Sequence, residues 1–218
     1  VQGIDFTAML AGGYYACPVL FLVAALSFAA ATRDRLYAYF ALHAIVLGGL
    51  SLTFPPIAPA FDATEPWHMM FRMLAESYVV ATIGLLLERL VLPDAPRWLR
   101  WPIRSLFPLG LIAACFAAHL AHNSHLLPVY GAVMLSLLLI LIVTLAICVL
   151  RGSKGAILLT IAMAPLVTVG VIAAALEALP YPSLPYYAEG MLFGFAFELM
   201  FVSAVIARRQ RDTMRERD

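Results

Sequence analysis

The chain has 218 residues, of which 63% are hydrophobic and only 12% are charged, and its mean hydropathy is +0.92. A soluble domain is usually about half apolar and a quarter charged, so this composition excludes an ordinary soluble protein and indicates an integral membrane protein. The net charge of +1 is uninformative, and no stretch is polar enough to form a separate soluble domain, so one bundle is expected.

Seven apolar segments of membrane-spanning length follow one another along the chain, separated by short polar breaks. About 20 apolar residues in a helix are enough to cross the hydrocarbon core of a bilayer. The sequence therefore predicts an all-α integral membrane bundle of seven transmembrane helices. The predicted helices cover about residues 6–31, 36–54, 66–92, 103–120, 125–150, 156–179 and 186–207.

Lys and Arg residues are distributed very unevenly among the breaks. All but one of the 14 basic residues lie in or beside the breaks after the first, third, fifth and seventh segments, and Arg72 is the exception. Because basic loops remain in the cytoplasm, the N-terminus is predicted to lie outside and the C-terminus in the cytoplasm. Residues 1–207 would form the membrane domain, and residues 208–218 a cytoplasmic helical tail or the start of a signalling linker.

Both ends of the chain carry information. Val1 is not a start methionine and no signal peptide is visible, so we expect a processed or excised piece of a longer protein. At the other end, the basic stretch from Arg208 to Arg217 contains no Gly or Pro that would end a helix. The last helix is therefore predicted to run past the membrane surface.

The third predicted helix carries three polar side chains four residues apart, His68, Arg72 and Glu76. This spacing places them on one face of the helix, where Arg72 and Glu76 can form an ion pair. Charges within a membrane are costly and face the bundle interior or water, so these residues are candidates for an outward-facing ligand pocket. A purely structural ion pair is an equally good interpretation.

Glu198 lies about halfway along the last predicted helix, among Phe and Met residues. A lone carboxylate at that depth must be protonated, hydrogen-bonded or paired, so it is a candidate proton-linked switch or a polar clasp between helices. His43, in the second helix, is a possible partner that the sequence cannot place beside it. Glu189, nearer the outer end of the last helix, joins the ligand-binding candidates.

His119, His122 and His125 form an H-x-x-H-x-x-H pattern around the end of the fourth helix. Spacing of three can put two imidazoles on one helical face, so His119 and His122 are candidate zinc or copper ligands. The helix is expected to end between them, and no Cys or carboxylate stands beside them. We therefore prefer to interpret them as polar residues at the membrane interface, and we expect no metal.

Several other classes of function lack the residues that they require. A retinal protein needs a lysine in its seventh helix for the Schiff base, and the only lysine is Lys154, in a loop, so no retinal is expected. Histidines distributed over the last helices, as a membrane metalloamidase would need, are missing, as are phosphate-binding and nucleophile motifs. The three cysteines lie inside apolar segments, and the basic tail is expected to contact lipid headgroups instead of nucleic acid. The chain itself is not expected to be an enzyme.

Two stretches resemble a known family. The sequence RDRLYAYFAL at residues 33–42, after a first helix with Gly13-Tyr14-Tyr15, is similar to the start of the bacterial seven-transmembrane receptors with diverse intracellular signalling modules. The sequence GFAFELMFVSAVIARR at residues 194–209 resembles the last helix of that family, in which a Glu precedes small residues and Ser. The resemblance spans essentially the whole chain.

The resemblance implies a receptor domain in the bacterial cytoplasmic (inner) membrane that couples an extracytoplasmic or intramembrane ligand to a cytoplasmic output through helix 7. It also implies a homodimer or a cytoplasmic signalling partner, an unidentified small ligand, and catalysis only in a fused or partner output domain. The residues alone leave open a small-solute transporter or channel, or a non-catalytic subunit of a larger membrane complex.

Overall fold

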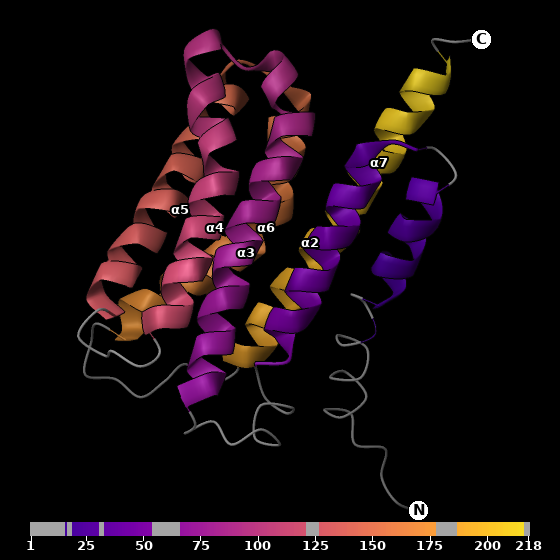
Figure 1. Ribbon diagram of the computed structural model, residues 1–218. Coiled ribbons are helices and arrows are strands. Elements are labelled where there is room, and N and C mark those ends of the chain that lie inside the picture. The colour runs from indigo at the N-terminus through magenta and orange to yellow at the C-terminus, as the bar shows by residue number, and fades with distance from the viewer. Residues whose placement is uncertain are drawn as a thin grey trace, which may run out of the picture.

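The computed structural model describes residues 16, 19–30, 33–53, 66–120, 127–177 and 187–215 (Figure 1). Within these ranges all regular structure is helical, which confirms the predicted all-α class for this part of the chain. The α-helices are an N-terminal helix Val19–Ala30, α2 Arg35–Ser51, α3 Pro66–Leu90, α4 Arg100–Leu120, α5 Leu127–Leu150, α6 Lys154–Glu177 and α7 Tyr187–Arg215, and two short 3-10 helices, η2 Leu92–Asp94 and η3 Arg97–Leu99, connect α3 to α4.

The turn between the N-terminal helix and α2 is built by Arg33 and Asp34. Arg33 adopts a left-handed conformation with φ 55°, and its N–H donates to the carbonyl of Ala29, which closes the preceding helix. The carboxylate of Asp34 then accepts a hydrogen bond from the backbone N–H of Leu36 at 2.9 Å. Asp34 thus caps α2 at its first turn.

Several helix ends differ from the sequence-based prediction, and α2 ends at Ser51 and not at residue 54. The α3 helix ends at Leu90 and not at residue 92, because Pro93 disfavours helical geometry in the residue before it. The α4 helix begins at Arg100 and not at residue 103, since a proline such as Pro102 is tolerated in the first turn of a helix. The α6 helix begins at Lys154 and not at residue 156, after Ser153, whose hydroxyl accepts from the N–H of Ala156 at 3.4 Å.

The last helix is continuous. Helix α7 runs from Tyr187 to Arg215 without interruption, as the absence of Gly and Pro from the basic stretch predicts. Helices α4 and α6 continue through Pro108 and Pro165 respectively.

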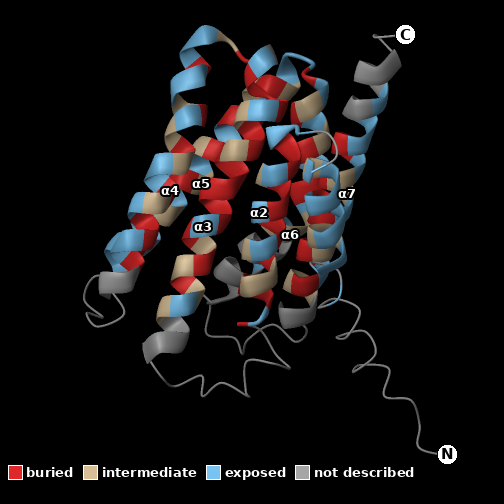
Figure 2. Ribbon diagram, turned by 45° about the vertical axis from the view of Figure 1, so that its right-hand side comes forward, coloured by how far each residue is buried: buried red, intermediate tan, exposed pale blue. Residues whose placement is uncertain are grey.

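The helices pack in a clear order. Helix α3 packs most extensively against α4 and also against α2, α6 packs against α7, and α2 contacts α7 (Figure 1). Buried residues lie where helices face one another, and exposed residues follow the outer sides (Figure 2). Helix α2 therefore lies between α3 and α7, and this position allows one of its side chains to contact both.

Glycines set the closest helix contacts. A Cβ atom built on Gly110 of α4 would lie 2.8 Å from the backbone nitrogen of Ala81 in α3, and one built on Gly84 would lie 2.9 Å from the backbone nitrogen of Phe107. On α7, a Cβ at Gly194 would lie 3.0 Å from the Cα atom of Leu166. Small residues at helix interfaces are the usual means of close packing in membranes.

Four described helices are long and apolar enough to cross a membrane: Met70–Leu90, Arg97–Ala117, Pro128–Leu150 and Gly190–Arg208. Shorter apolar helical stretches are Val19–Ala30 and Lys154–Thr168. A multi-pass membrane protein follows from these helices. The predicted total of seven crossings and the predicted orientation of the termini remain predictions.

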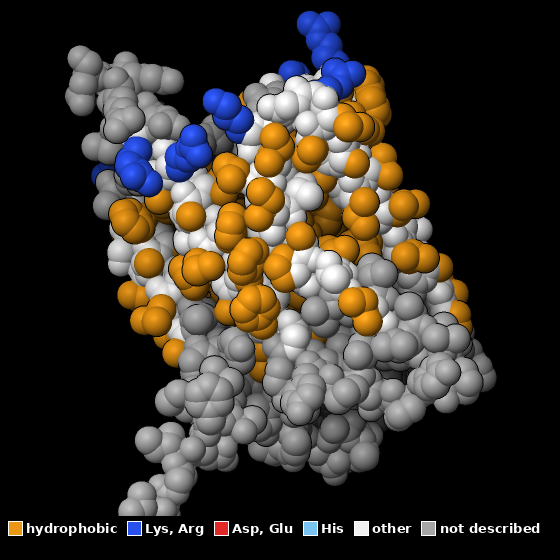
Figure 3. Space-filling model, turned by 180° about the vertical axis from the view of Figure 1, so that it is seen from behind, with side chains coloured by type: hydrophobic (Ala, Val, Ile, Leu, Met, Phe, Trp, Pro, Cys, Tyr) orange, Lys and Arg blue, Asp and Glu red, His pale blue; other side chains and the backbone are white. Residues whose placement is uncertain are grey.

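The Lys and Arg side chains seen in Figure 3 gather at one end of the bundle, above a surface that is mostly hydrophobic. This end, which we call the basic end, carries the breaks after α3 and α5 and the last turns of α7. The grouping agrees with the unequal distribution along the sequence.

Candidate functional site

Three polar side chains from three helices meet inside the bundle. His43 of α2, Thr82 of α3 and Glu198 of α7 have exposed fractions of 0%, 2% and 0%. The Nδ1 atom of His43 lies 2.8 Å from Oγ1 of Thr82, and its Nε2 atom lies 3.2 Å from Oε1 of Glu198. The structure thus brings together His43 and Glu198, a pairing that the sequence left open. We call these residues the buried trio.

The tautomer of His43 decides how the protons of the trio are shared. The Thr82 hydroxyl has one proton and lies within hydrogen-bond distance of the carbonyls of Tyr78 at 2.9 Å and Val79 at 3.0 Å as well as of Nδ1 of His43. Nδ1 donates to the hydroxyl when the Thr82 proton goes to a carbonyl, and accepts from it otherwise. A proton between Nε2 and Oε1 completes the second contact, whether it belongs to an imidazolium or to a carboxylic acid. The pair is joined through one proton in either form.

Glu198 also has an unsatisfied atom. Its Oε2 is the one buried side-chain nitrogen or oxygen among the described residues that has no hydrogen-bond partner. A buried polar atom without a partner costs about 1–3 kcal/mol relative to one that is bonded. The carboxyl group is therefore bonded through Oε1 only, and Oε2 is available to accept a hydrogen bond if the neighbouring helices move.

The position of Glu198 on α7 follows from the helical period. Phe195, Leu199 and Val202 are buried, at spacings of three and four residues, and Glu198 lies on the same stripe. Phe193 and Met200, on the other side of α7, are each 50% exposed. The carboxylate is therefore directed into the bundle and not toward lipid.

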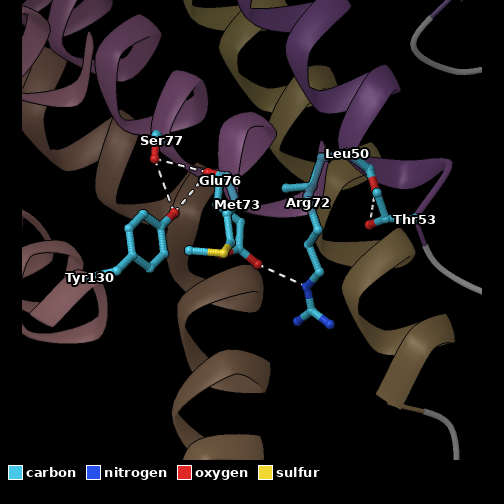
Figure 4. Close-up of polar contacts among 7 residues, drawn as sticks. All are labelled: Leu50, Thr53, Arg72, Met73, Glu76, Ser77 and Tyr130. Carbon is cyan, nitrogen blue, oxygen red and sulfur yellow. Dashed lines mark hydrogen bonds and ion pairs between the residues drawn. The ribbon is translucent and has the colours of Figure 1, made fainter. Parts of the chain in front are cut away.

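A second polar cluster joins α3 to α5. The hydroxyl of Tyr130 donates to the carbonyl of Met73 at 2.8 Å and lies 3.0 Å from Oγ of Ser77, which also donates to Met73 at 2.9 Å (Figure 4). Ser77 is fully buried and Tyr130 is 6% exposed. Oγ of Ser77 also lies 3.8 Å from the sulfur of Met134. This cluster connects helices that otherwise share few contacts.

The predicted ion pair on α3 is present. Nε of Arg72 lies 3.0 Å from Oε1 of Glu76, and the two side chains are 43% and 33% exposed (Figure 4). A pair this exposed adds little to stability. A role in ligand binding stays a prediction, and the side chain of His68 lies outside what the structure describes.

The remaining site predictions fall on residues that are not fully described. His119 and Glu189 belong to α4 and α7, but their side chains lie outside the described part, and His122 lies outside it altogether. Among the described residues, no group of three or more His, Cys, Asp or Glu could hold a metal ion. The metal site therefore stays untested.

Thr82, Ser77 and Tyr130 are site residues that sequence reasoning missed. Ser and Thr within an apolar helix commonly bond the carbonyl four residues earlier, as Ser77 and Thr82 both do. Their presence alone therefore does not indicate contact with another helix. Tyr130 follows a proline near the start of its helix, where a tyrosine at the membrane interface is ordinary.

Comparison with known proteins identifies the family. The family model described as 7TM diverse intracellular signalling matches residues 7–209, nearly the whole chain. No curated protein and no solved structure matches the chain. The match agrees with the resemblance carried by residues 33–42 and 194–209, which include the capped turn before α2 and the stretch around Glu198. The chain belongs to the 7TM diverse intracellular signalling family, a family of seven-transmembrane receptor domains.

Proposed function

We propose that this domain transmits a signal across the membrane by changing the position of α7, and that the buried trio holds α7 in one of two positions. The observation that carries the proposal is the bond between His43 and Glu198, 155 residues apart in sequence. It joins α7, the continuous helix that runs from Tyr187 to Arg215, to the centre of the bundle.

The energetics of this contact suit a switch. Moving α7 by more than about one ångström would break the Nε2–Oε1 bond and leave two buried polar groups without partners, which the hydrocarbon surroundings penalise. Packed helices therefore favour discrete positions over a continuous range. The free acceptor Oε2 could bond in a second position of α7, at no added desolvation cost.

The proposal extends to the ends of the molecule. A small ligand would act at the end opposite the basic end, where Arg72 and Glu76 are partly exposed, or between helices. The basic end would face the cytoplasm of a bacterium, and α7 would act there on a fused or partner output domain, in a homodimer or a complex. The chain itself would have no catalytic activity.

The test measures the position of α7 directly. Spin labels at residues 151 and 211, both exposed at the basic end, report the distance between the α5–α6 turn and α7 in a cysteine-free background. We expect Glu198→Leu and His43→Leu to shift the distance distribution in the same way, and the double variant to shift it no further, since one shared contact is lost. Glu88→Leu, at a 39% exposed side chain paired with Arg104, is the matched control and should leave the distribution unchanged.

Signalling is tested with the same variants. In a fusion that places an output enzyme after Asp218, the loss of the bond should change basal output between about 5- and 150-fold, the usual range of allosteric coupling. Glu198→Gln, which keeps the side-chain shape, serves if the leucine variants fail to fold. Wild-type distances and wild-type output in all Glu198 and His43 variants would overturn the proposal.

A further inference from the structure

A groove runs along the outer surface of the bundle between α5 and α6. It has a volume of about 340 Å³. Ala146 of α5 and Ala164 of α6 are both exposed in it, and their small side chains leave the space that larger residues would fill. The groove is lined by Leu141, Ile142, Leu145, Ala146, Val149, Thr160, Met163, Ala164, Val167 and Thr168.

The groove lies where lipid surrounds the protein. Only 28% of the spanning part of α5 is buried, against 61% for α3. Figure 3 shows the side of the molecule opposite to that of Figure 1, and hydrophobic side chains cover much of the part that it describes below the basic residues. Hydrocarbon, and not water, is therefore the medium into which this groove opens.

The dimensions of the groove suit a single hydrocarbon chain. The lining residues from Leu141 to Val149 on α5 extend over about 12 Å of helix. A groove of about 340 Å³ over that length has room for one extended hydrocarbon chain.

One end of the groove is positively charged. Val149 and Thr160 lie a turn or two of helix from the connecting turn, where Arg151 and Lys154 are both exposed. No Asp or Glu occurs between residues 127 and 160, so no carboxylate from these two helices competes for the two cations. The first turn of α6 adds the partial positive charge of a helix N-terminus.

We propose that the groove and this turn together form a binding site for one anionic glycerophospholipid. One acyl chain lies in the groove, and the phosphate lies against Arg151 and Lys154. A zwitterionic lipid of the same chain length has the same fit in the groove but gains less from the two cations, because its headgroup carries a compensating positive charge.

The test is retention of defined lipids by the purified full chain, measured by native mass spectrometry after removal of co-purified lipid. Dioleoyl phosphatidylglycerol and dioleoyl phosphatidylcholine differ only in the headgroup. The wild-type chain should retain the first more tightly. The double variant Arg151→Gln, Lys154→Gln should weaken phosphatidylglycerol binding on the order of tenfold and weaken phosphatidylcholine binding clearly less.

Filling the groove tests the acyl-chain part of the site. Ala146→Phe and Ala164→Phe, from opposite walls, should each weaken binding of both lipids. Ala132→Phe, exposed on α5 outside the groove, and Arg97→Gln with Arg100→Gln, exposed at the basic end between α3 and α4, are the matched controls and should bind as wild type.

Three results would overturn the proposal. The first is equal retention of the two lipids by the wild-type chain. The second is an equal effect of target and control variants, which would indicate a non-specific lipid shell. The third is that the groove-filling variants change the oligomeric mass but still retain lipid. That result would identify the groove as a protein interface. Because none of these measurements depends on the position of α7, they leave the proposed signalling function untouched.

Discussion

At the scale of single residues, two buried polar clusters in this protein bond across helices. His43 contacts two helices at once, and the hydroxyl of Tyr130 spans from α5 to α3. In hydrocarbon a polar side chain has no water to bond, so a partner on a neighbouring helix is favoured. Such bonds add modest stability, yet they specify which helix faces are in contact.

The Tyr130 hydroxyl offers a direct measure of this contribution. Tyr130→Phe removes its bond to the Met73 carbonyl, and we expect a loss in the free energy of unfolding of about 0.6–1.7 kcal/mol, which lies between the average and the largest value for such bonds in a membrane protein. Unfolding by sodium dodecyl sulfate in mixed micelles measures it. Tyr78→Phe, on α3 with a 41% exposed ring, is the control and should be neutral. Equal effects of the two would show that the Tyr130 bond contributes nothing.

At the scale of elements, the short distance between α3 and α4 depends on glycines, which have no side chain to hold the two helices apart. Gly84 and Gly110 each bring their own helix against the backbone of the other. This close packing fixes α3, which in turn positions Thr82 beside α2. The position of α3, and with it that of Thr82 in the buried trio, therefore depends in part on two glycines that have no side chain.

Gly110→Ala tests that dependence. Its Cβ would meet the backbone of Ala81 at 2.8 Å, so the helices must separate, and we expect destabilisation of about 1–3 kcal/mol. Gly131→Ala on α5 is the matched control, because nothing lies within 4 Å of its added Cβ. The control should be neutral or stabilising by up to about 1 kcal/mol, as alanine is the better helix former. Thermal unfolding in detergent compares the stabilities of the two variants, and only Gly110→Ala should be less stable than the wild type. A neutral effect of Gly110→Ala would contradict the close packing of α3 against α4.

At the scale of the whole molecule, the asymmetry of charge is the dominant feature. The Lys and Arg side chains seen in Figure 3 collect at one end of the bundle, and α7 ends on the side where α3 connects to α4 (Figure 1). Basic segments are retained on the cytoplasmic side during insertion, so this asymmetry decides the predicted orientation. The proposed signal would then leave the membrane on the side where soluble output domains are located.

Orientation can be measured by cysteine labelling in intact cells. In a background without Cys17, Cys115 and Cys148, a cysteine at Lys154 should be protected from a membrane-impermeant maleimide until the cells are opened. A cysteine at Ser183, in the predicted outer loop before α7, should react at once. Labelling of both positions from outside, or the reverse pattern, would contradict the predicted orientation.

The local features of this protein were largely predictable from its sequence. The helical class, most of the helix bounds and the continuity of the last helix follow from hydropathy, prolines and charged breaks, which act over a few residues. The Arg72–Glu76 pair follows from spacing within one helix. Errors of two or three residues occurred at helix ends, where a single cap or proline decides the outcome.

By itself the sequence determined a membrane-spanning helical chain with its basic residues in alternate breaks and a costly carboxylate at Glu198. Only the tertiary structure decided what that carboxylate contacts, because His43 and Thr82 come from other helices and no local pattern encodes the packing between them. The groove between α5 and α6 is likewise invisible in hydropathy, since its residues are as apolar as those that pack together. The physical reason is the same in both cases: hydrophobicity places a helix in the membrane, whereas close fit and hydrogen bonds choose its neighbours.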